Sequence, residues 1–330
     1  MAKLVVVTGS SAGVGRATAR EFARRGYRVG LLARGAARLE DARRELEGLG
    51  ASVCPVSADV ADADAVEAAA ARITGALGPI DVWVNNAMAT IFAPVHDITP
   101  DEFRRATEVT YLGTVNGTMA ALRRMRARNR GSIVNVGSAL SYRAIPLQSA
   151  YCGAKYAIRG FTDSLRSELL HERLNVHLTM VHLAAMNTPQ FDWARSKMVR
   201  RAQPVPPIYQ PEVAARAIFF AATHRRREVW VGWPTVRAIL ANRVAPGLLD
   251  HYLAHAGYRG QLSDERQPAD APDNLFTTVD NHFGAHGHFD AQARNRSWEM
   301  WTSRHRDAVM GAAMLLGLMG LGALVRGRRN

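Results

Sequence analysis

The chain has 330 residues, 48% of them hydrophobic and 22% charged, so it can bury a large core and is neither disordered throughout nor a protein of many membrane spans. Its two cysteines, Cys54 and Cys152, cannot form a disulfide framework and favour a reducing compartment. The net charge of +13 comes almost entirely from arginines spread along predicted helices, without a zinc-finger, leucine-zipper or RNA-binding signature. We therefore expect no specific nucleic-acid binding.

From the N-terminus to about residue 234, short apolar runs alternate with longer segments of helical period. The predicted strands are residues 4–8, 28–34, 52–58, 80–85, 132–137, 176–182 and 228–231. The predicted helices are residues 13–25, 36–49, 62–75, 100–128, 149–172 and 211–223. Nearly continuous apolar strands separated by amphipathic helices indicate an α/β protein with a doubly wound parallel sheet covered on both faces. The first apolar run is too short for a signal peptide, so we expect a cytoplasmic catalytic domain.

The alternation stops after residue 234. Residues 235–256 are predicted to be helical, and residues 257–297 are rich in Asp, Pro, Gly, Asn and His, which favours a loop-like connector. Residues 308–325 are uncharged and, as a helix, could span about 27 Å. The predicted organisation is a catalytic domain (1–234), an extension (235–307) and an apolar helix (308–325).

The apolar helix has two interpretations. We favour a C-terminal membrane anchor, because eighteen uncharged residues between arginines have no other evident burial. The alternative is a buried helix that packs on the protein or on a partner subunit, and four glycines weaken both interpretations.

A glycine-rich turn links the first predicted strand to the first predicted helix. Glycines let the backbone approach a pyrophosphate, and a helix N-terminus supplies N–H groups and a positive dipole end. An ordinary turn is the alternative, but the position between a strand and a helix is the context that dinucleotide binding requires. The turn consists of Thr8, Gly9, Ser10, Ser11, Ala12, Gly13, Val14 and Gly15.

The end of the second predicted strand indicates which dinucleotide is bound. An acid about 20 residues after the turn would bind the ribose 2′-hydroxyl of NAD, but the chain has Arg34 there and no acid. A guanidinium binds a 2′-phosphate well. We therefore expect NADP(H) in preference to NAD(H), with Arg34 at the 2′-phosphate and Arg38 able to share this role. A solvated arginine is the alternative.

Tyr151 and Lys155 lie four positions apart in a predicted helix, so their side chains share one face. A nearby ammonium favours the phenolate, which would lower the tyrosine pKa from about 10 and make Tyr151 a general acid–base. Such pairs also occur by chance, but lysine is scarce in this chain. Ser138 ends the fifth predicted strand, where side chains point into the crevice in which α/β sheets bind ligands.

In order and spacing, these motifs, together with Asp59-Val60 and Asn85-Asn86-Ala87, make residues 3–232 resemble the short-chain dehydrogenase/reductase family, and in particular bacterial members with a long C-terminal extension. The resemblance implies a Rossmann-type sheet of about seven strands, a nicotinamide cofactor, a carbonyl or alcohol substrate and a homodimer or homotetramer.

The resemblance also implies residue roles. Ser138 would bind the substrate oxygen, Tyr151 would exchange its proton, and Lys155 would hold the nicotinamide ribose and lower the tyrosine pKa. Asp59 and Val60 would contact the adenine, and Asn86 would support the site behind the nicotinamide. The expected cofactor-binding residues are Gly9, Ser11, Gly13, Val14, Gly15, Arg34, Asp59, Val60, Asn86, Ala87, Tyr151, Lys155 and Thr188.

Three departures from the family pattern stand out. Met88 replaces a glycine near the substrate, and Leu183-Ala184 replaces a Pro-Gly pair, although the cofactor-contacting threonine persists as Thr188. The fourth member of the family's catalytic set, an asparagine, aligns with Thr110. A threonine hydroxyl could still order a water, so we count Thr110 among the candidate catalytic residues.

Two further groups have competing interpretations. Phe191 and Trp193 lie in the segment that closes over substrate in the family and favour an apolar or aromatic substrate, but they could equally pack on the body of the protein. His282, His286, His288 and Asp290 lack an established metal-ligand spacing, so we expect no metal site.

The sequence therefore predicts an NADP-preferring oxidoreductase that transfers hydride between nicotinamide and a carbonyl or alcohol. The alternative from another functional class is an NADP(H)-binding sensor without turnover, or a membrane-associated adaptor, that acts through the C-terminal extension.

Overall fold

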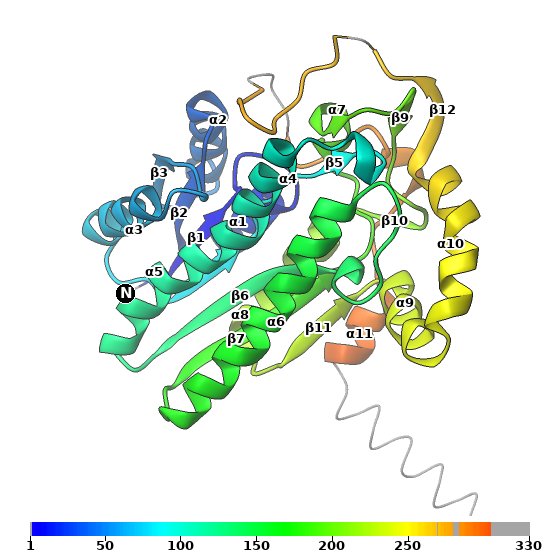
Figure 1. Ribbon diagram of the computed structural model, residues 1–330. Coiled ribbons are helices and arrows are strands. Elements are labelled where there is room, and N and C mark those ends of the chain that lie inside the picture. Colours follow the sequence, from blue (N-terminus) through cyan, green and yellow to red (C-terminus); the bar gives the residue numbers. More distant parts are fainter. Residues whose placement is uncertain (1, 269, 280–283, 305–330) are drawn as a thin grey trace, which may run out of the picture.

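Seven strands form a sheet at the centre of the protein (Figure 1). The computed structural model describes residues 2–268, 270–279 and 284–304. The sequence predicts each strand of this sheet to within two residues at either end. These strands are β1 (Leu4–Thr8), β2 (Arg28–Ala33), β3 (Val53–Ser57), β4 (Val82–Asn85), β6 (Gly131–Ser138), β7 (Val176–Leu183) and β11 (Glu228–Val231).

The order of the strands is β11-β7-β6-β4-β1-β2-β3, and every neighbouring pair is parallel. From β1 the chain adds β2 and β3 on one side, and then returns to add β4 on the other. The strand order therefore reverses between β1 and β4. The carboxyl ends of the strands at such a reversal are the place where open α/β sheets bind ligands.

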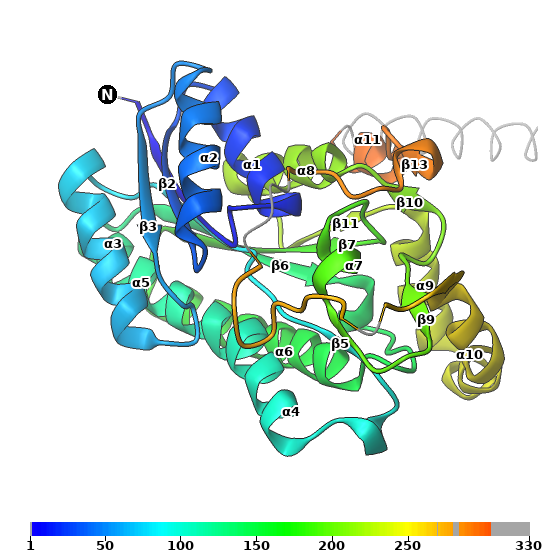
Figure 2. The same cartoon turned by 90° about the horizontal axis from the view of Figure 1, so that it is seen from above.

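Helices cover both faces of the sheet (Figure 2). Apolar residues of α1 (Gly13–Arg24), α2 (Ala36–Glu47) and α8 (Pro211–Thr223) form one buried cluster with the sheet. Those of α3 (Ala63–Leu77), α5 (Gly113–Ala127) and α6 (Ser149–His171) form the other. This confirms the predicted Rossmann-type α/β fold, in which both faces of a parallel sheet are buried.

The single helix predicted over residues 100–128 is wrong in one respect. It consists of α4 (Pro100–Thr107), a π-helical turn (Glu108–Leu112) and α5. Single π turns inside longer helices are rare and frequently lie at functional sites. This one contains Thr110, whose contacts are described below.

The C-terminal extension is also more structured than the sequence predicts. The helix expected at 235–256 is divided into α9 (Trp233–Val244) and α10 (Pro246–Gln261). Pro246 has no N–H and its ring would clash inside a helix, so the chain bends at Ala245 and restarts with the proline in the first turn. Within the expected connector, β12 (Leu262–Arg266) pairs antiparallel with β9 (Arg200–Ala202), and α11 (Trp298–Arg304) follows.

Two short parallel pairs complete the fold above the sheet. They are β5 (Ile91–Phe92) with β8 (Arg195–Ser196) and β10 (Ile208–Tyr209) with β13 (Ala293–Arg294). The apolar segment 308–325 lies outside the described residues, so the anchor stays a prediction. Within the described ranges, no helix is both long and apolar enough to cross a membrane.

Candidate active site

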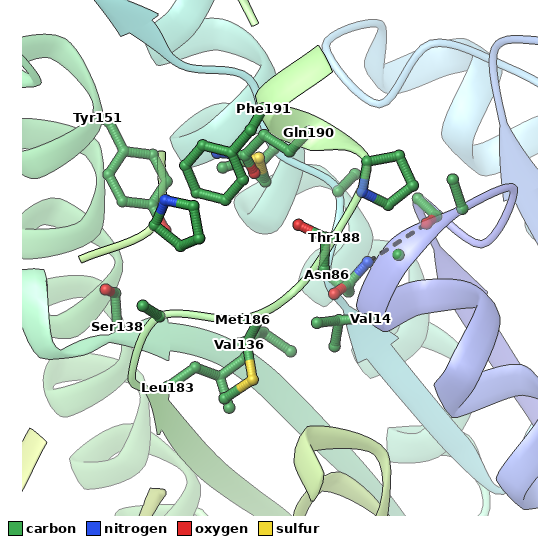
Figure 3. A pocket seen from close by; sticks show the side chains of 18 of the residues that line it. Val14, Asn86, Val136, Ser138, Tyr151, Leu183, Met186, Thr188, Gln190 and Phe191 are labelled. Atoms are coloured by element: carbon green, nitrogen blue, oxygen red, sulfur yellow. Dashed lines mark hydrogen bonds between the residues drawn. The ribbon is translucent and has the colours of Figure 1, made fainter. Parts of the chain in front are cut away.

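A cavity of about 410 Å³ opens at the carboxyl ends of the strands. Figure 3 shows Ser138 and Tyr151 on one side of it, and Val14, Asn86 and Thr188 on the other. The sheet reversal therefore brings the predicted catalytic and nucleotide-binding groups into one continuous space. Every predicted site residue lines this cavity except Gly15 and Thr110.

The glycine turn has the tight geometry that a dinucleotide requires. Gly9 and Gly13 have φ angles of +65° and +56°, a region that side chains rarely adopt. Gly15 does not line the cavity, but a Cβ there would overlap the carbonyl oxygen of Gly9 and the Asn86 side chain. Its role is therefore to let the turn fold tightly.

Asn86 ties the end of β4 to this turn. Its Nδ2 donates to the carbonyl oxygens of Thr8 at 3.1 Å and Gly9 at 3.3 Å. The Thr8 hydroxyl in turn accepts from the backbone N–H groups of Asn86 at 3.0 Å and Ala87 at 3.1 Å. These contacts fix the glycine turn relative to the floor of the cavity.

Positive charge gathers at the other end of the nucleotide side. Arg34 lines the cavity together with Arg38, Asp59 and Val60. Asp59 forms an ion pair with Arg105 of α4. Burial lowers the pKa of Arg34, and the positive charge of Arg105 lowers it further. An anion bound at this end of the cavity would relieve that repulsion.

Ser138 and Tyr151 form the polar part of the substrate side. The Ser138 Oγ accepts the Leu140 N–H at 3.1 Å, which leaves its own proton to donate. The Lys155 Nζ is buried, lies 5.5 Å from the centre of the Tyr151 ring and donates to the Val136 carbonyl oxygen at 2.7 Å. The structure therefore brings the predicted Ser–Tyr–Lys set together.

The electrostatics of this set differ from the prediction. Burial raises the pKa of Tyr151 well above 10, and a hydrogen bond with Ser138 offsets this only in part. Burial also lowers the pKa of Lys155 from 10.5 to about 7. The expected lowering of the tyrosine pKa by Lys155 is thus not seen, because burial has the largest effect on the pKa of both groups.

Thr110 faces away from the cavity. Its hydroxyl accepts the Ala89 N–H and donates to the Ala89 carbonyl oxygen, both at 3.0 Å, and its side chain is fully buried. The proton that could have ordered a catalytic water is therefore already used. Thr110 fixes the segment after Asn86 in place, and the structure does not bring it to the reacting groups.

His182 contacts the backbone of Ser138, and the sequence does not predict this contact. Its Nδ1 lies 3.1 Å from the Ser138 carbonyl oxygen, and its Nε2 lies 3.6 Å from the Glu228 carboxylate. Glu228 accepts from the Tyr142 hydroxyl and from the Trp230 indole. Because a carbonyl oxygen can only accept, Nδ1 donates to the Ser138 carbonyl group. Burial lowers the pKa of His182 to about 4. A histidine inside a predicted strand carried no signal for this role.

The substrate side of the cavity is largely apolar. Phe191 and Met88 line the cavity, and the Phe191 ring packs on Phe92 with centroids 6.1 Å apart. Trp193 also lines the cavity, but it lies at the nucleotide end with the Arg38 guanidinium 4.9 Å from its ring. Phe191 and Trp193 thus line different ends of the cavity.

The histidines of the extension form ion pairs. His286 lies between Glu212, at 2.9 Å, and Asp290, at 2.8 Å. His288 pairs with Asp192 at 3.0 Å, and His282 lies outside the described residues. In the part of the chain that the structure describes, no group of three or more His, Cys, Asp or Glu side chains could hold a metal ion.

Comparison with known proteins identifies the family. The family model described as short chain dehydrogenase matches residues 3–198, more than half of the chain. The chain belongs to the short-chain dehydrogenases. An uncharacterized oxidoreductase, YxnA of Bacillus subtilis, is 31% identical over 99% of this chain and 91% of its own length. Dehydrogenase/reductase SDR family member 7B of Bos taurus is 34% identical over 56% of this chain and 58% of its own.

Two solved structures of similar fold were crystallised with related cofactors. An alcohol dehydrogenase of Thermococcus sibiricus, in complex with 5-hydroxy-NADP, superposes with a TM-score of 0.60 at 27% identity and covers 70% of this chain and 96% of its own. A metagenomic short-chain oxidoreductase in complex with NADP gives a TM-score of 0.59, also at 27% identity, over 69% of this chain and 96% of its own. The protein is therefore an oxidoreductase of this family with a small-molecule substrate.

Proposed function

We propose that the protein interconverts an alcohol and a carbonyl compound with NADP(H), using Ser138, Tyr151 and Lys155. The observation that carries this proposal is one cavity that joins a Ser–Tyr–Lys set to a glycine turn and to Arg34. Bound NADP(H) would supply or accept the hydride. The residues of the chain would hold the substrate oxygen and move its proton.

Ser138 is suited to orient the substrate. Because its Oγ accepts the Leu140 N–H, the hydroxyl proton can point toward a substrate oxygen in the cavity. His182 holds the Ser138 backbone from the opposite side, so the serine is fixed at both its side chain and its carbonyl group. Such fixing reduces the entropy lost when the substrate binds.

Tyr151 is suited to donate the proton during reduction. A phenol whose pKa is raised is fully protonated at neutral pH and can donate to a carbonyl oxygen. During oxidation the same group must accept a proton. The charged form of Lys155, 5.5 Å from the ring centre, would then stabilise the phenolate.

NADP is favoured by charge. Arg34, Arg38 and Arg105 gather at the end of the cavity where the adenosine would lie, and Asp59 is already paired with Arg105. A 2′-phosphate would neutralise part of this charge, whereas a 2′-hydroxyl would not. The apolar side chains around Ser138 and Tyr151 favour an apolar carbonyl compound or alcohol.

The test is the substitution Tyr151→Phe, assayed with NADPH or NADP⁺ against a panel of apolar carbonyl compounds and alcohols. Loss of the proton donor should reduce turnover by about 100-fold or more. The matched control is Tyr156→Phe on the same helix, since the exposed Tyr156 donates to the Tyr142 carbonyl oxygen outside the cavity. Unchanged turnover in Tyr151→Phe would refute the proposed role.

A non-catalytic NADP(H) sensor is the second candidate. The observation that favours it is Thr110, which is bonded to Ala89 where the family has its fourth catalytic residue. A sensor would bind NADPH tightly but oxidise or reduce nothing across the panel. Turnover that depends on Tyr151 would exclude it.

A further inference from the structure

Part of the C-terminal extension borders the nucleotide end of the cavity, where Asn274 lines it. We call residues 273–279 and 284–290 the strap. The strap lies beyond the family match, which ends at residue 198. Figure 2 shows this part of the chain in orange, running across the edge of the sheet near α7 (Gln190–Trp193). At the glycine turn, the Gly13 N–H donates to the Gly284 carbonyl oxygen at 3.2 Å.

The strap makes its most specific contact with Arg34. The Arg34 Nη1 donates to the carbonyl oxygens of Leu275 and Phe276, both at 3.3 Å, and Nη2 donates to that of Asn274. These contacts use three of the five N–H groups of a guanidinium. The Nε–H and one Nη2–H of Arg34 remain available for a bidentate hydrogen-bonded contact with an anion.

The three carbonyl groups hold Arg34 without neutralising it. No carboxylate in the described ranges forms an ion pair with Arg34, and Asp59, whose charge also acts on Arg34, is paired with Arg105. The Arg105 Nε also donates to the Leu275 carbonyl oxygen, at 3.1 Å. Two guanidinium groups thus converge on one neutral acceptor, and their charge can be balanced by an anion at the adenosine end of the cavity.

Asp273 and Leu275 determine how the strap presents these carbonyl groups. The Asp273 Oδ1 accepts the Leu275 N–H at 3.0 Å, which closes a tight turn. Its Oδ2 accepts from Arg195, at 2.8 Å from Nη2 and 3.1 Å from Nε. The Leu275 side chain is fully buried in the core cluster that contains α3 and α5. The turn is therefore held at both ends.

We propose that the strap is part of the cofactor site and that Asp273 is a positioning residue, which orients Arg34 through the carbonyl groups of residues 274–276 to bind the 2′-phosphate of NADP. The inference rests on the proposed use of NADP(H). An arginine side chain is flexible, and fixing it before binding removes the entropy that the phosphate contact would otherwise cost. The specificity for NADP would then depend on a segment outside the family match.

The test separates the 2′-phosphate from the rest of the cofactor. Adenosine 2′,5′-bisphosphate and adenosine 5′-monophosphate are titrated by calorimetry into the full-length wild type and Asp273→Ala. In the variant, the affinity for the bisphosphate should fall roughly tenfold, the scale of one lost charge-assisted contact. The affinity for the monophosphate should change less than threefold. The control is Asp264→Ala, which removes an exposed aspartate that pairs with Arg200 at 3.0 Å.

A double-mutant cycle tests whether Asp273 acts through Arg34. In the background of Arg34→Ala, Asp273→Ala should have no further effect on the bisphosphate. Asp273→Asn keeps an acceptor for the Leu275 N–H and should fall between the wild type and Asp273→Ala. If Asp273→Ala unfolds, this milder variant provides the measurement.

Three results would overturn the inference. Equal loss of both nucleotides would mean that the strap only covers the adenosine, and tighter binding of the bisphosphate would mean that the carbonyl groups compete with the phosphate. If the wild type prefers the bisphosphate and Asp273→Ala keeps the same ratio of bisphosphate to monophosphate affinity, the role proposed for the strap is refuted. The proposed use of NADP(H) would then stand. A wild type without that preference would refute the NADP proposal, and the strap inference with it.

Discussion

The ammonium nitrogen of Lys155 lies 2.7 Å from the carbonyl oxygen of Val136, so the only lysine of α6 is anchored to β6 two residues before Ser138. Its side chain is buried, and that burial lowers its pKa from 10.5 to about 7. The charged form of Lys155 therefore lowers the stability of the folded protein. This is the form that would stabilise a phenolate at Tyr151.

This burial predicts a stability that depends on pH in a defined direction. Between about pH 7 and pH 10.5 the unfolded chain protonates Lys155 and the folded chain does not, so the free energy of unfolding gains a contribution that rises with pH across this interval. Lys155→Met lacks this contribution and should gain stability relative to the wild type as the pH is lowered from 10 to 7. Urea unfolding at the two pH values measures it.

The difference in the free energy of unfolding between Lys155→Met and the wild type cancels the pH effects of groups that both proteins share. Lys155→Met should also lose turnover, because no cation would remain beside Tyr151. A stability difference that stays constant from pH 7 to pH 10 would show that Lys155 has the same protonation in the folded and unfolded states, which contradicts the prediction.

We expect substitution of Thr110 to lower the stability of the protein without a direct effect on turnover. Thr110→Val keeps the shape of the side chain but leaves the buried N–H and carbonyl groups of Ala89 without their partner. The free energy of unfolding should fall by about 1–3 kcal/mol. Thr110→Ser keeps the hydroxyl and is the matched control, which should remain closer to the wild type in both stability and turnover.

The midpoint and slope of urea unfolding, together with kcat, distinguish the two roles of Thr110. A structural role lowers the midpoint of Thr110→Val at an unchanged slope. If the midpoint were unchanged while kcat fell sharply, the hydroxyl would act in catalysis, as the sequence analysis had expected.

Local sequence patterns were sufficient to predict the sheet and to select candidate site residues most of which line one cavity. The strands are continuous apolar runs between turns, and the glycine turn, Ser138 and Tyr151 follow from their positions at strand and helix ends. The contacts of Thr110 could not be predicted, because its hydroxyl binds the backbone of Ala89, which no side-chain pattern reveals. The strap was missed because residues 274–276 are about 240 positions from Arg34, within a segment whose polar composition is typical of a loop.

Pro246 shows a different kind of error. The helix predicted over residues 235–256 runs across this proline, because apolar residues on either side of it continue a helical pattern. The structure restarts the helix at Pro246, as the missing N–H requires. The second half of this segment, α10, is followed directly by β12, so the misplaced boundary also hid the strand that leads into the strap.

We expect the strap to be held less strongly at high pH, because His286 binds Glu212 and Asp290. Burial lowers the pKa of His286, but its hydrogen bonds with Glu212 and Asp290 outweigh this and raise the pKa above 6.5. A raised folded-state pKa gives stability that is fully present below the unfolded value and is lost as the pH rises through the folded value. His286→Gln should therefore be less stable than the wild type at pH 6, and the difference should narrow as the pH rises above 6.5.

The measurement is the difference in Tm between His286→Gln and the wild type at several pH values. Glu212 itself faces Arg20 at 3.4 Å, so it keeps a cationic partner when His286 is neutral. In the background of Glu212→Gln, the effect of His286→Gln should therefore depend less on pH, since one of the two carboxylates that favour the charged imidazole is gone. A Tm difference that is equal at pH 6 and pH 9 in the wild-type background would show that the histidine packs there without its charge, and that the strap is held by its neutral contacts alone.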